Sequence, residues 1–256
     1  MLKIATFNIK NDYKVYDPEK AETIYNFLVK EKIDILCLQE VFDKCSDDLC
    51  KKIKDTEYNM YGKYRFRLHI LRTINEKTPI ITKKAKTTKT MHLPHLPSPL
   101  KRVITRVVTD TEDGKIAVYN THLDFMYEFT KKRQLKRIIK IIKREKLPVV
   151  LVGDFNAKTN KEFFNEFVDE LKNLGIERVK IDEKTLKQSK YNRAIDHLFI
   201  SNSFKVISKR VEKDLKISDH YPLIITIKKK KENVKQNVNK DWNPCFYIAR
   251  KGIIDI

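Results

Sequence analysis

The sequence predicts an α/β protein in which packed mixed β-sheets are flanked by helices. Short apolar runs rich in β-branched residues, which are typical of strands, alternate with patterns of helical periodicity. Many of the strand-like runs are neighbours, as in hairpins, so a doubly wound parallel sheet is not expected. The chain has 256 residues, 41% of them hydrophobic, which is enough for one large core. We therefore expect one domain rather than two.

The first third of the chain is expected to alternate strand, helix and strands. Residues 2–9 form an apolar run of strand length. Residues 18–30 are expected to be a helix, because Asp17 can cap it and Pro18 suits its first turn. Further strands are expected where apolar runs recur, over residues 33–39, 64–71 and 79–84.

A loop, a hairpin and a long helix are expected next. Residues 91–100 contain three prolines, which exclude a helix interior and a central strand, so we expect a loop. The runs 103–109 and 115–121 flank the turn Glu112-Asp113-Gly114, as in a β-hairpin. In residues 129–146 the apolar positions share one helical face, and we interpret the Lys/Arg-rich remainder as a solvated surface.

The last third is expected to return to strands. Residues 148–152 have the length and composition of a buried strand, and Asn160 is expected to cap a helix over 161–171. Further strands are expected over residues 194–201, 205–212 and 221–228. We expect residues 1–228 to be the catalytic domain and residues 229–256 to be a basic linker, polar as far as Trp242, and a C-terminal tail that is apolar again.

The composition limits the partners and the compartment. There are 54 Lys and Arg against 34 Asp and Glu, a net charge of +20, which favours anionic partners such as nucleic acid, lipid head groups or phosphorylated metabolites. A compositional bias of the source explains the excess of Lys equally well. The four cysteines form no CxxC motif, which argues against disulfides and structural zinc. We expect a monomeric cytoplasmic protein with no signal peptide and no transmembrane segment.

Polar residues stand at the ends of the predicted strands. In Gly153-Asp154-Phe155-Asn156, a carboxylate and a carboxamide two residues apart point to the same side after a buried strand. One such group is an ordinary turn, but comparable groups recur at Asn8, Gln39-Glu40, Thr121-His122, Asp196 and Asp219-His220. We predict that these residues converge on one site.

This set of side chains suits the hydrolysis of phosphoesters. Carboxylate oxygens bind Mg²⁺ or Mn²⁺, whereas a zinc site would use more His or Cys. The cation neutralises the phosphate, and imidazoles move protons or donate to phosphate oxygens. A catalytic histidine needs a carboxylate to fix its tautomer, and Asp196 is a candidate for that partner.

Six ordered motifs resemble those of the endonuclease/exonuclease/phosphatase superfamily, the group with the deoxyribonuclease I fold. The resemblance spans residues 1 to about 228 and implies a four-layer α/β sandwich with the site at one end of two sheets. The motifs are Thr6-Phe7-Asn8-Ile9, Leu38-Gln39-Glu40-Val41, Asn120-Thr121-His122-Leu123, Gly153-Asp154-Phe155-Asn156, Ile195-Asp196-His197 and Ser218-Asp219-His220.

The resemblance also implies a role for each residue at the metal. Glu40 would be the main ligand of Mg²⁺ or Mn²⁺, with Asn8 close by. Asp219 would be a second ligand or a neighbour of that site. 

The remaining motif residues would act on the water and the phosphate. Asp154 would activate or orient the nucleophilic water, and Asn156 would hold the phosphate. His122 would stabilise the transition state, contact the substrate or protonate the leaving group. His220 would contact the phosphate or act as the base, oriented by Asp196.

The chain departs from the family pattern in two places. Many members carry Arg-Ile-Asp where this chain has Ala194-Ile195-Asp196, so Arg193, one place earlier, is our candidate for a substrate contact. Residues 77–83 lack the Gly and Asn of a phosphate-contacting stretch. His197 follows Asp196 on a strand, so its side chain should point away from the site.

The sequence leaves several functions open. A metal-dependent phosphodiesterase or phosphatase is the first, and a DNA-cleaving endonuclease or exonuclease of repair or degradation is the second. A catalytically inactive phosphate-binding module is a third, although no expected catalytic residue is missing. A lipid phosphodiesterase would need an exposed apolar contact, for which the loop 91–100 is a weak candidate.

Overall fold

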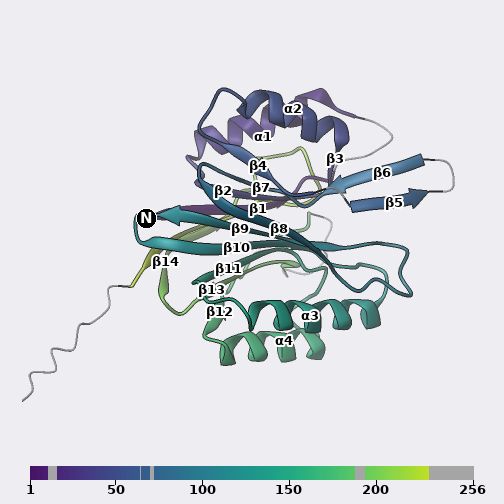
Figure 1. Ribbon diagram of the computed structural model, residues 1–256, viewed down its shortest axis with the longest axis vertical. Helices are drawn as coiled ribbons and strands as arrows, with labels where there is room; N and C mark the ends of the chain where they lie inside the picture. Colours follow the sequence, from purple (N-terminus) through teal and green to yellow (C-terminus); the bar gives the residue numbers. More distant parts are fainter. Residues whose placement is uncertain (11–15, 64, 70–71, 188–193, 231–256) are drawn as a thin grey trace, which may run out of the picture.

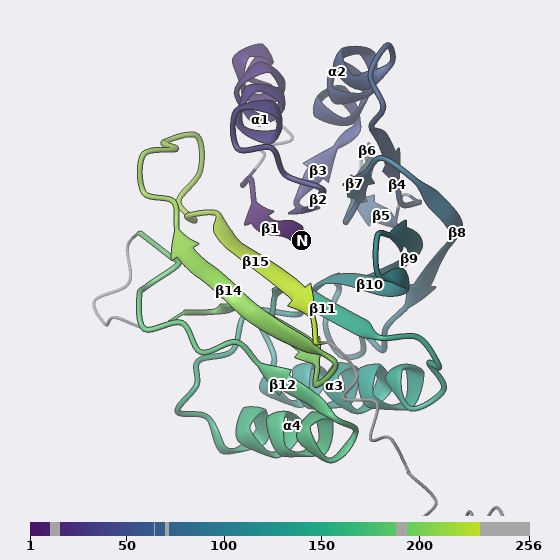
Figure 2. The same ribbon diagram turned by 90° about the vertical axis from the view of Figure 1, so that its left-hand side faces the viewer.

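Two six-stranded mixed β-sheets pack face to face between two pairs of helices, as the computed structural model of the protein shows (Figure 1). The structure describes residues 1–10, 16–63, 65–69, 72–187 and 194–230. Seen from the side, α1 and α2 cover one sheet and α3 and α4 cover the other (Figure 2). The predicted four-layer α/β sandwich is therefore confirmed.

The first sheet carries two of the motif strands side by side. Strands β1 and β2 are parallel, so Asn8 at the end of β1 lies level with Gln39 at the end of β2. Helices α1 (Pro18–Lys30) and α2 (Asp43–Ile53) belong to this half of the molecule. The sheet order is β14 (Phe204–Val211), β15 (Leu223–Lys229), β1 (Leu2–Asn8), β2 (Ile35–Gln39), β7 (Ile80–Thr82) and β4 (Asn59–Tyr61).

The second sheet brings the other motif strands to the same end. Strands β10 and β11 are parallel, which places His122 level with Asp154, and β13 runs antiparallel to β11 with Asp196 opposite Asp154. Helices α3 (Glu128–Ile142) and α4 (Glu162–Asn173) cover its outer face. The sheet order is β12 (Ile176–Arg178), β13 (Asp196–Ser201), β11 (Val149–Asp154), β10 (Gly114–His122), β9 (Val103–Thr111) and β8 (Ala85–His92).

A small three-stranded sheet projects from the sandwich as an arm (Figure 1). Its strands are β3 (Val41–Phe42), β6 (Arg72–Lys77) and β5 (Arg65–His69). Strand β3 begins directly after Glu40, and Val41 pairs with Lys77. The base of the arm is thus one residue from a predicted metal ligand.

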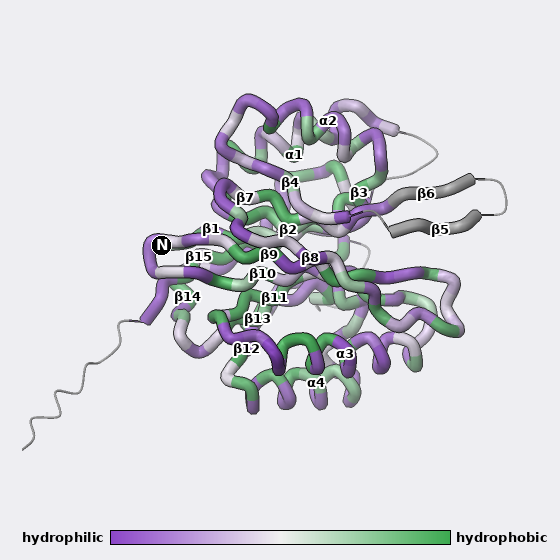
Figure 3. Tube along the Cα trace, in the orientation of Figure 1, coloured by the Kyte–Doolittle hydropathy of each residue, from purple (hydrophilic) through white to green (hydrophobic). Residues whose placement is uncertain are grey.

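Apolar residues fill the three spaces between the layers. Ile4, Val118 and Val150 lie between the two sheets, whereas Phe27 and Phe164 pack between a sheet and its helices. Figure 3 shows hydrophobic residues along the strands and on the inner turns of the helices, with polar residues outside. Burial of these faces, rather than local propensity, stabilises such short elements.

Most predicted elements are present, and the Asp17 side chain does accept a hydrogen bond from the Glu19 backbone N–H. The prediction of a loop over 91–100 is wrong at its start, because Met91 and His92 belong to the edge strand β8, where no Pro interrupts pairing. The Asn160 cap is also wrong: α4 begins at Glu162, after Lys161 at the cap position.

Several elements were not predicted or differ in length. No element was expected at helix α2 or at strands β3, β4, β6, β8 and β12, and α3 ends at Ile142 rather than at residue 146. Strand β15 extends to Lys229, and residues 231–256 lie outside the described residues, so the proposed linker and tail stay a prediction. No helix in the described part of the chain is long and apolar enough to cross a bilayer.

Candidate active site

The strand that carries Asp154 can approach its neighbour only because residue 153 is glycine. Gly153 has φ of 142°, and a Cβ there would lie 1.9 Å from the backbone oxygen of Thr121. Strands β10 and β11 are paired at this point, so neither backbone can retreat. Glycine therefore sets the position of the two residues that follow in the motif, Asp154 and Asn156.

Two predicted site residues have left-handed backbone conformations. Glu40 has φ of 59° and Asn156 has φ of 47°, a region that residues other than glycine seldom occupy. Such conformations persist when the surrounding structure imposes them, and they are concentrated at functional sites. Both residues leave a strand end at the same end of the sandwich.

The side chain of Asn8 joins two carboxylates. Its Nδ2 donates to Glu40 Oε1 at 3.2 Å and to Asp154 Oδ2 at 3.0 Å, while its Oδ1 accepts from the Lys10 backbone N–H. The Asp154 side chain is buried, whereas that of Glu40 is 29% exposed. Glu40 is thus the member of this pair that remains open to a ligand from solvent.

His220 is held between two buried aspartates. Its Nδ1 is hydrogen-bonded to Asp196 Oδ2 at 2.9 Å, and its Nε2 lies 3.8 Å from Asp154 Oδ2. Burial by itself would lower the pKa of His220, but the charge and hydrogen bond of Asp196 and the charge of Asp154 raise it to about 10. The imidazole is therefore protonated at neutral pH.

The pKa of the Asp154 carboxylate is raised as well. Burial and the nearby charge of Asp196 raise its pKa to about 6, although His220 and the Asn8 hydrogen bond act to lower it. A carboxylate with this pKa is a far better proton acceptor near neutral pH than an ordinary aspartate.

His122 is held by a buried arginine that the sequence did not indicate. Arg102 Nη1 lies 2.8 Å from His122 Nδ1, and Glu76 Oε1 lies 3.5 Å from the same guanidinium nitrogen. A guanidinium can only donate, so Nδ1 accepts and the ring proton is on Nε2. That Nε2–H faces Asp154 Oδ2 at 3.6 Å and Glu40 Oε1 at 3.9 Å. His122 is placed as a neutral hydrogen-bond donor.

Comparison with family models gives a match to the Endonuclease/Exonuclease/phosphatase family over residues 5–220. The chain belongs to this family. The match spans every motif of the site described above, from Asn8 to His220. A search of curated proteins finds no match.

Solved structures of this family share its fold at low sequence identity. An endonuclease/exonuclease/phosphatase from Bacteroides vulgatus is 20% identical with a TM-score of 0.73, over 90% of this chain and 99% of that chain. A mannosyl-6-phosphatase from Bacteroides thetaiotaomicron is 18% identical with a TM-score of 0.70, over 89% and 100%. The human Nocturnin catalytic domain, with bound sulfate, is 17% identical with a TM-score of 0.71, over 90% and 94%.

The other predicted residues lie at the edge of this cluster or elsewhere. Asp219 forms an ion pair with Lys10 at 2.6 Å rather than a contact with Glu40. Asn156 Nδ2 donates to the backbone oxygen of Leu123, and the Asn156 N–H donates to Asp154 Oδ1. Arg193 lies outside the described residues.

His197 does point away from the family's site residues. Its ring packs against Phe164, with centroids 4.5 Å apart, and against Phe155 at 5.7 Å. Its Nε2 is 2.8 Å from the backbone oxygen of Ala157. Burial lowers the pKa of His197 to about 4, so it is a neutral core residue.

The donor set of this family site fits a hard divalent cation. Asp154, Asp196 and His220 present ligand atoms within 4.8 Å of one another, and the buried Asp196 Oδ1 has no hydrogen-bond partner among the described residues. Because His220 is already bonded to Asp196, the groups left to hold a cation are carboxylate oxygens, with Glu40 the most exposed. Oxygen donors suit Mg²⁺ or Mn²⁺ better than zinc.

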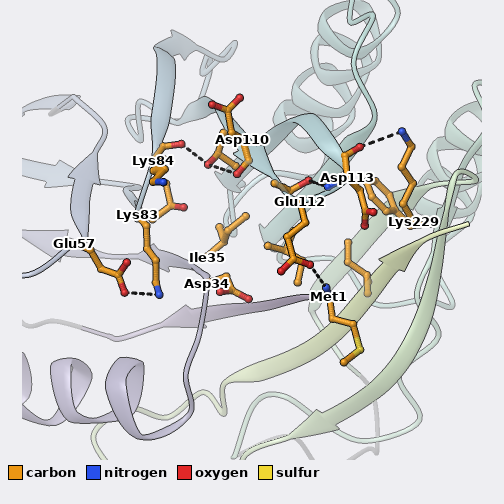
Figure 4. A pocket seen from close by; sticks show the side chains of 16 residues that line it. Met1, Asp34, Ile35, Glu57, Lys83, Lys84, Asp110, Glu112, Asp113 and Lys229 are labelled. Atoms are coloured by element: carbon orange, nitrogen blue, oxygen red, sulfur yellow. Dashed lines mark hydrogen bonds and ion pairs between the residues drawn. The ribbon is translucent and has the colours of Figure 1, made fainter.

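A separate pocket of about 370 Å³ lies at the opposite end of the sheets, where β1 begins and the β9–β10 turn closes (Figure 4). Several of its charged groups have partners: the N-terminal amine contacts Glu112 at 3.0 Å, Lys83 contacts Glu57, and Lys229 donates to the backbone oxygen of Asp113. It lacks the histidines and the convergent carboxylates of the site at the other end.

Proposed function

We propose that this protein is a hydrolase of phosphoester bonds that uses Mg²⁺ or Mn²⁺. The observation that supports it best is the buried Asp154–His220–Asp196 cluster, in which His220 Nδ1 lies 2.9 Å from Asp196 Oδ2 and His220 Nε2 lies 3.8 Å from Asp154 Oδ2. Burial and the neighbouring charges raise the pKa of Asp154, and the neighbouring charges raise that of His220 against its burial; such perturbed groups are typical of acid–base sites. We place the catalytic domain in residues 1–228.

Glu40 is the principal ligand of the cation in this proposal. When bound, the cation would neutralise charge on the phosphate. Asn8 orients Glu40 through its Nδ2 hydrogen bond. Asp219 lies beside the site with Lys10, from which it can hold a second ligand position.

Asp154 accepts the proton from the attacking water. Its raised pKa and buried position suit a base, whereas His220 is already protonated and cannot take up another proton. His220 therefore donates a hydrogen bond to a phosphate oxygen or its proton to the leaving oxygen, and Asp196 stabilises the imidazolium through Nδ1. The water oxygen forms the new bond to phosphorus as the bond to the leaving oxygen breaks.

His122 and Asn156 hold the phosphate in this scheme. His122 carries its proton on Nε2, so it stabilises negative charge on an oxygen rather than serving as the base. Asn156 Nδ2 uses one N–H to bond the backbone oxygen of Leu123, which fixes the side chain, and its second N–H can donate to a phosphate oxygen. These contacts orient the phosphorus for attack.

A nucleic acid substrate is the second candidate, and one observation favours it. The net charge of +20 attracts polyanions, and some of its cations line a groove between α3 and strands β8 and β9. An inactive binding module is disfavoured because every side chain that the chemistry needs is present among the described residues.

The test is a metal-dependent assay with bis-p-nitrophenyl phosphate, p-nitrophenyl phosphate, plasmid DNA and RNA. We expect EDTA to abolish hydrolysis and added Mg²⁺ or Mn²⁺ to restore it, and Glu40→Gln to lower the apparent affinity for the cation. Full activity in the chelator would remove the cation from the mechanism. Absence of hydrolysis of every ester, with both cations present, would overturn the proposed function.

A further inference from the structure

A cationic groove lies between helix α3 and the edge of the second sheet. Its volume is about 350 Å³, and it is lined by Arg137, Lys140 and Arg144 from α3 and the following turn, by Lys89 from β8 and by Arg106 from β9. Arg137, Lys140 and Arg144 are spaced three and four residues apart, so they share one helical face. We call these lining residues the cationic groove.

Most of the charge in the cationic groove is not neutralised. Among the described residues, Glu145 is the only carboxylate that lines it, and it bonds Arg106 Nε and Tyr119 Oη at 2.7 Å each. Burial would raise the pKa of Glu145, but these two hydrogen bonds lower it to about 2, so it stays ionised and balances Arg106. The other four cations of the groove are exposed and form no ion pair with a described residue.

An exposed apolar cluster lies at the N-terminal end of α3, beside the active site. Nine large hydrophobic residues are exposed in the described part of the chain, and five of them gather here: Leu96, Phe125, Met126, Tyr127 and Phe129. The last four lie in the loop after His122 and in the first turn of α3, and this loop begins at Leu123, whose backbone oxygen accepts from Asn156, so apolar exposure is concentrated at the rim of the site. We call this set the apolar rim.

The apolar rim and the cationic groove are connected through α3. Arg133 Nη1 and Thr130 Oγ1 both donate to the backbone oxygen of Leu96 at 3.3 Å, and the Arg133 guanidinium lies 5.7 Å from the centre of the Phe129 ring. Arg133 is one helical turn before Arg137 on the same face, and Lys140 lies about 10 Å further along the axis than Arg133. One continuous track therefore runs from the rim into the groove.

The shape of this track favours a single polyanionic strand. Lys89 and the α3 cations line a concavity from both sides, which a strand can enter and a flat bilayer cannot fill. Exposed rings stack on bases, and bases offer their faces in single strands but not inside a duplex.

We propose that the apolar rim and the cationic groove bind single-stranded nucleic acid and lead it to the active site. Phe125, Tyr127 and Phe129 stack on bases at the rim, and the groove cations contact successive phosphates. This inference rests on the proposed function, because it names the substrate class of the same site.

The binding test uses a fluorescein-labelled oligothymidylate in EDTA, where it is not cleaved. We expect the R137Q/K140Q/R144Q variant to bind at least about tenfold more weakly near physiological salt. Three lost phosphate contacts should also reduce the slope of log K against log salt by about 2 for a single strand. The matched control is K54Q/K172Q/K205Q, which removes the same charge from exposed sites elsewhere and should bind like the wild type.

Replacing the rings separates stacking from charge. Phe129→Ala should weaken binding about tenfold with an unchanged salt slope, because stacking contributes about 1–3 kcal/mol per base. Hydrolysis of bis-p-nitrophenyl phosphate should be the same in the groove variant, the control and the wild type.

The outcomes for the substrate class and for the proposed function are distinguishable. Equal oligonucleotide binding by the groove variant and the control, or no binding by the wild type, overturns this inference while ester hydrolysis still supports the function. Groove-dependent sedimentation with phosphatidylcholine/phosphatidylserine vesicles, without oligonucleotide binding, overturns it in favour of a membrane. Groove-dependent oligonucleotide binding without hydrolysis of any ester overturns the proposed function instead.

Discussion

His197 offers a quantitative test of which histidine belongs to the chemistry. It stands next to Asp196 in the sequence, yet its ring lies among phenylalanines and its pKa is lowered to about 4 by burial. Arg178 lowers that pKa further, whereas Asp196 and the backbone oxygen of Ala157 raise it. The perturbation is His197→Phe, which keeps an aromatic ring but removes the titration.

The expected magnitude follows from the two pKa values. The pKa of a histidine in the unfolded state is ~6.5, whereas that of His197 in the folded state is about 4. As the pH falls from ~6.5 to about 4, the unfolded state therefore takes up a proton that the folded state does not. The stabilisation is complete above pH ~6.5 and is lost as the pH falls, by about 3 kcal/mol once the pH is below the folded value. About 2 kcal/mol of it is lost between pH ~7 and pH ~5.

The assay is urea unfolding of the wild type and His197→Phe at several pH values. All other groups titrate in both proteins, so the difference between their free energies of unfolding isolates His197. That difference should shift by about 2 kcal/mol in favour of the variant from pH ~7 to pH ~5. His197→Gln keeps a donor for Ala157 and removes the titration, so it should show the same shift.

Activity provides the second readout. Because His197 contacts none of Glu40, Asp154 and His220, both variants should keep kcat close to the wild-type value near neutral pH. If the difference between the free energies of unfolding of wild type and variant did not change with pH, His197 could not be a buried neutral imidazole. A fall in kcat as large as that of a His220 variant would refute its exclusion from the mechanism.

The remaining predictions concern the site itself. Asp154→Asn and His220→Ala should each lower kcat at least ~10²-fold, and a near-normal rate would remove that residue from the mechanism. Gly153→Ala should destabilise the fold by at least ~3 kcal/mol in thermal unfolding. Gly175→Ala should cost only about 1 kcal/mol, because a Cβ there would meet only Asn202 Nδ2, at 3.8 Å; equal costs would contradict the close strand contact. Arg102→Met should replace the single His122 Nε2–H tautomer by a mixture in ¹⁵N NMR spectra, with Arg102→Lys partly restoring it; an unchanged spectrum would show that another group fixes the ring.

The sequence alone predicted the site residues that stand at the ends of strands. Asn8, His122 and Asp154 each close an apolar run, and parallel pairing brings such ends together whatever lies between them. The apolar runs of β1, β2, β10 and β11 were recognisable for the same reason, since strands buried on both faces are continuously hydrophobic.

Features that depend on tertiary contacts were not predictable. Arg102 precedes a strand like many surface arginines, and only the fold places its guanidinium against His122. Helix α2 is short and rich in charge, and it is stabilised by packing of Leu49 and Ile53 rather than by a cap. The cationic face of α3 looked like a solvated surface because Lys89 comes from a strand more than forty residues earlier in the chain.

The position of Glu40 between two sheets has a mechanical consequence. Strand β2 ends at Gln39 in the first sheet, and β3 begins at Val41 in the arm, so Glu40 belongs to neither ladder. The arm reaches the site a second time, because Glu76 on β6 lies 3.5 Å from Arg102 Nη1, and Arg102 holds His122. The residue proposed to hold the cation and the arginine that orients His122 therefore both touch the base of the arm, so a change in the arm would alter two parts of the site at once.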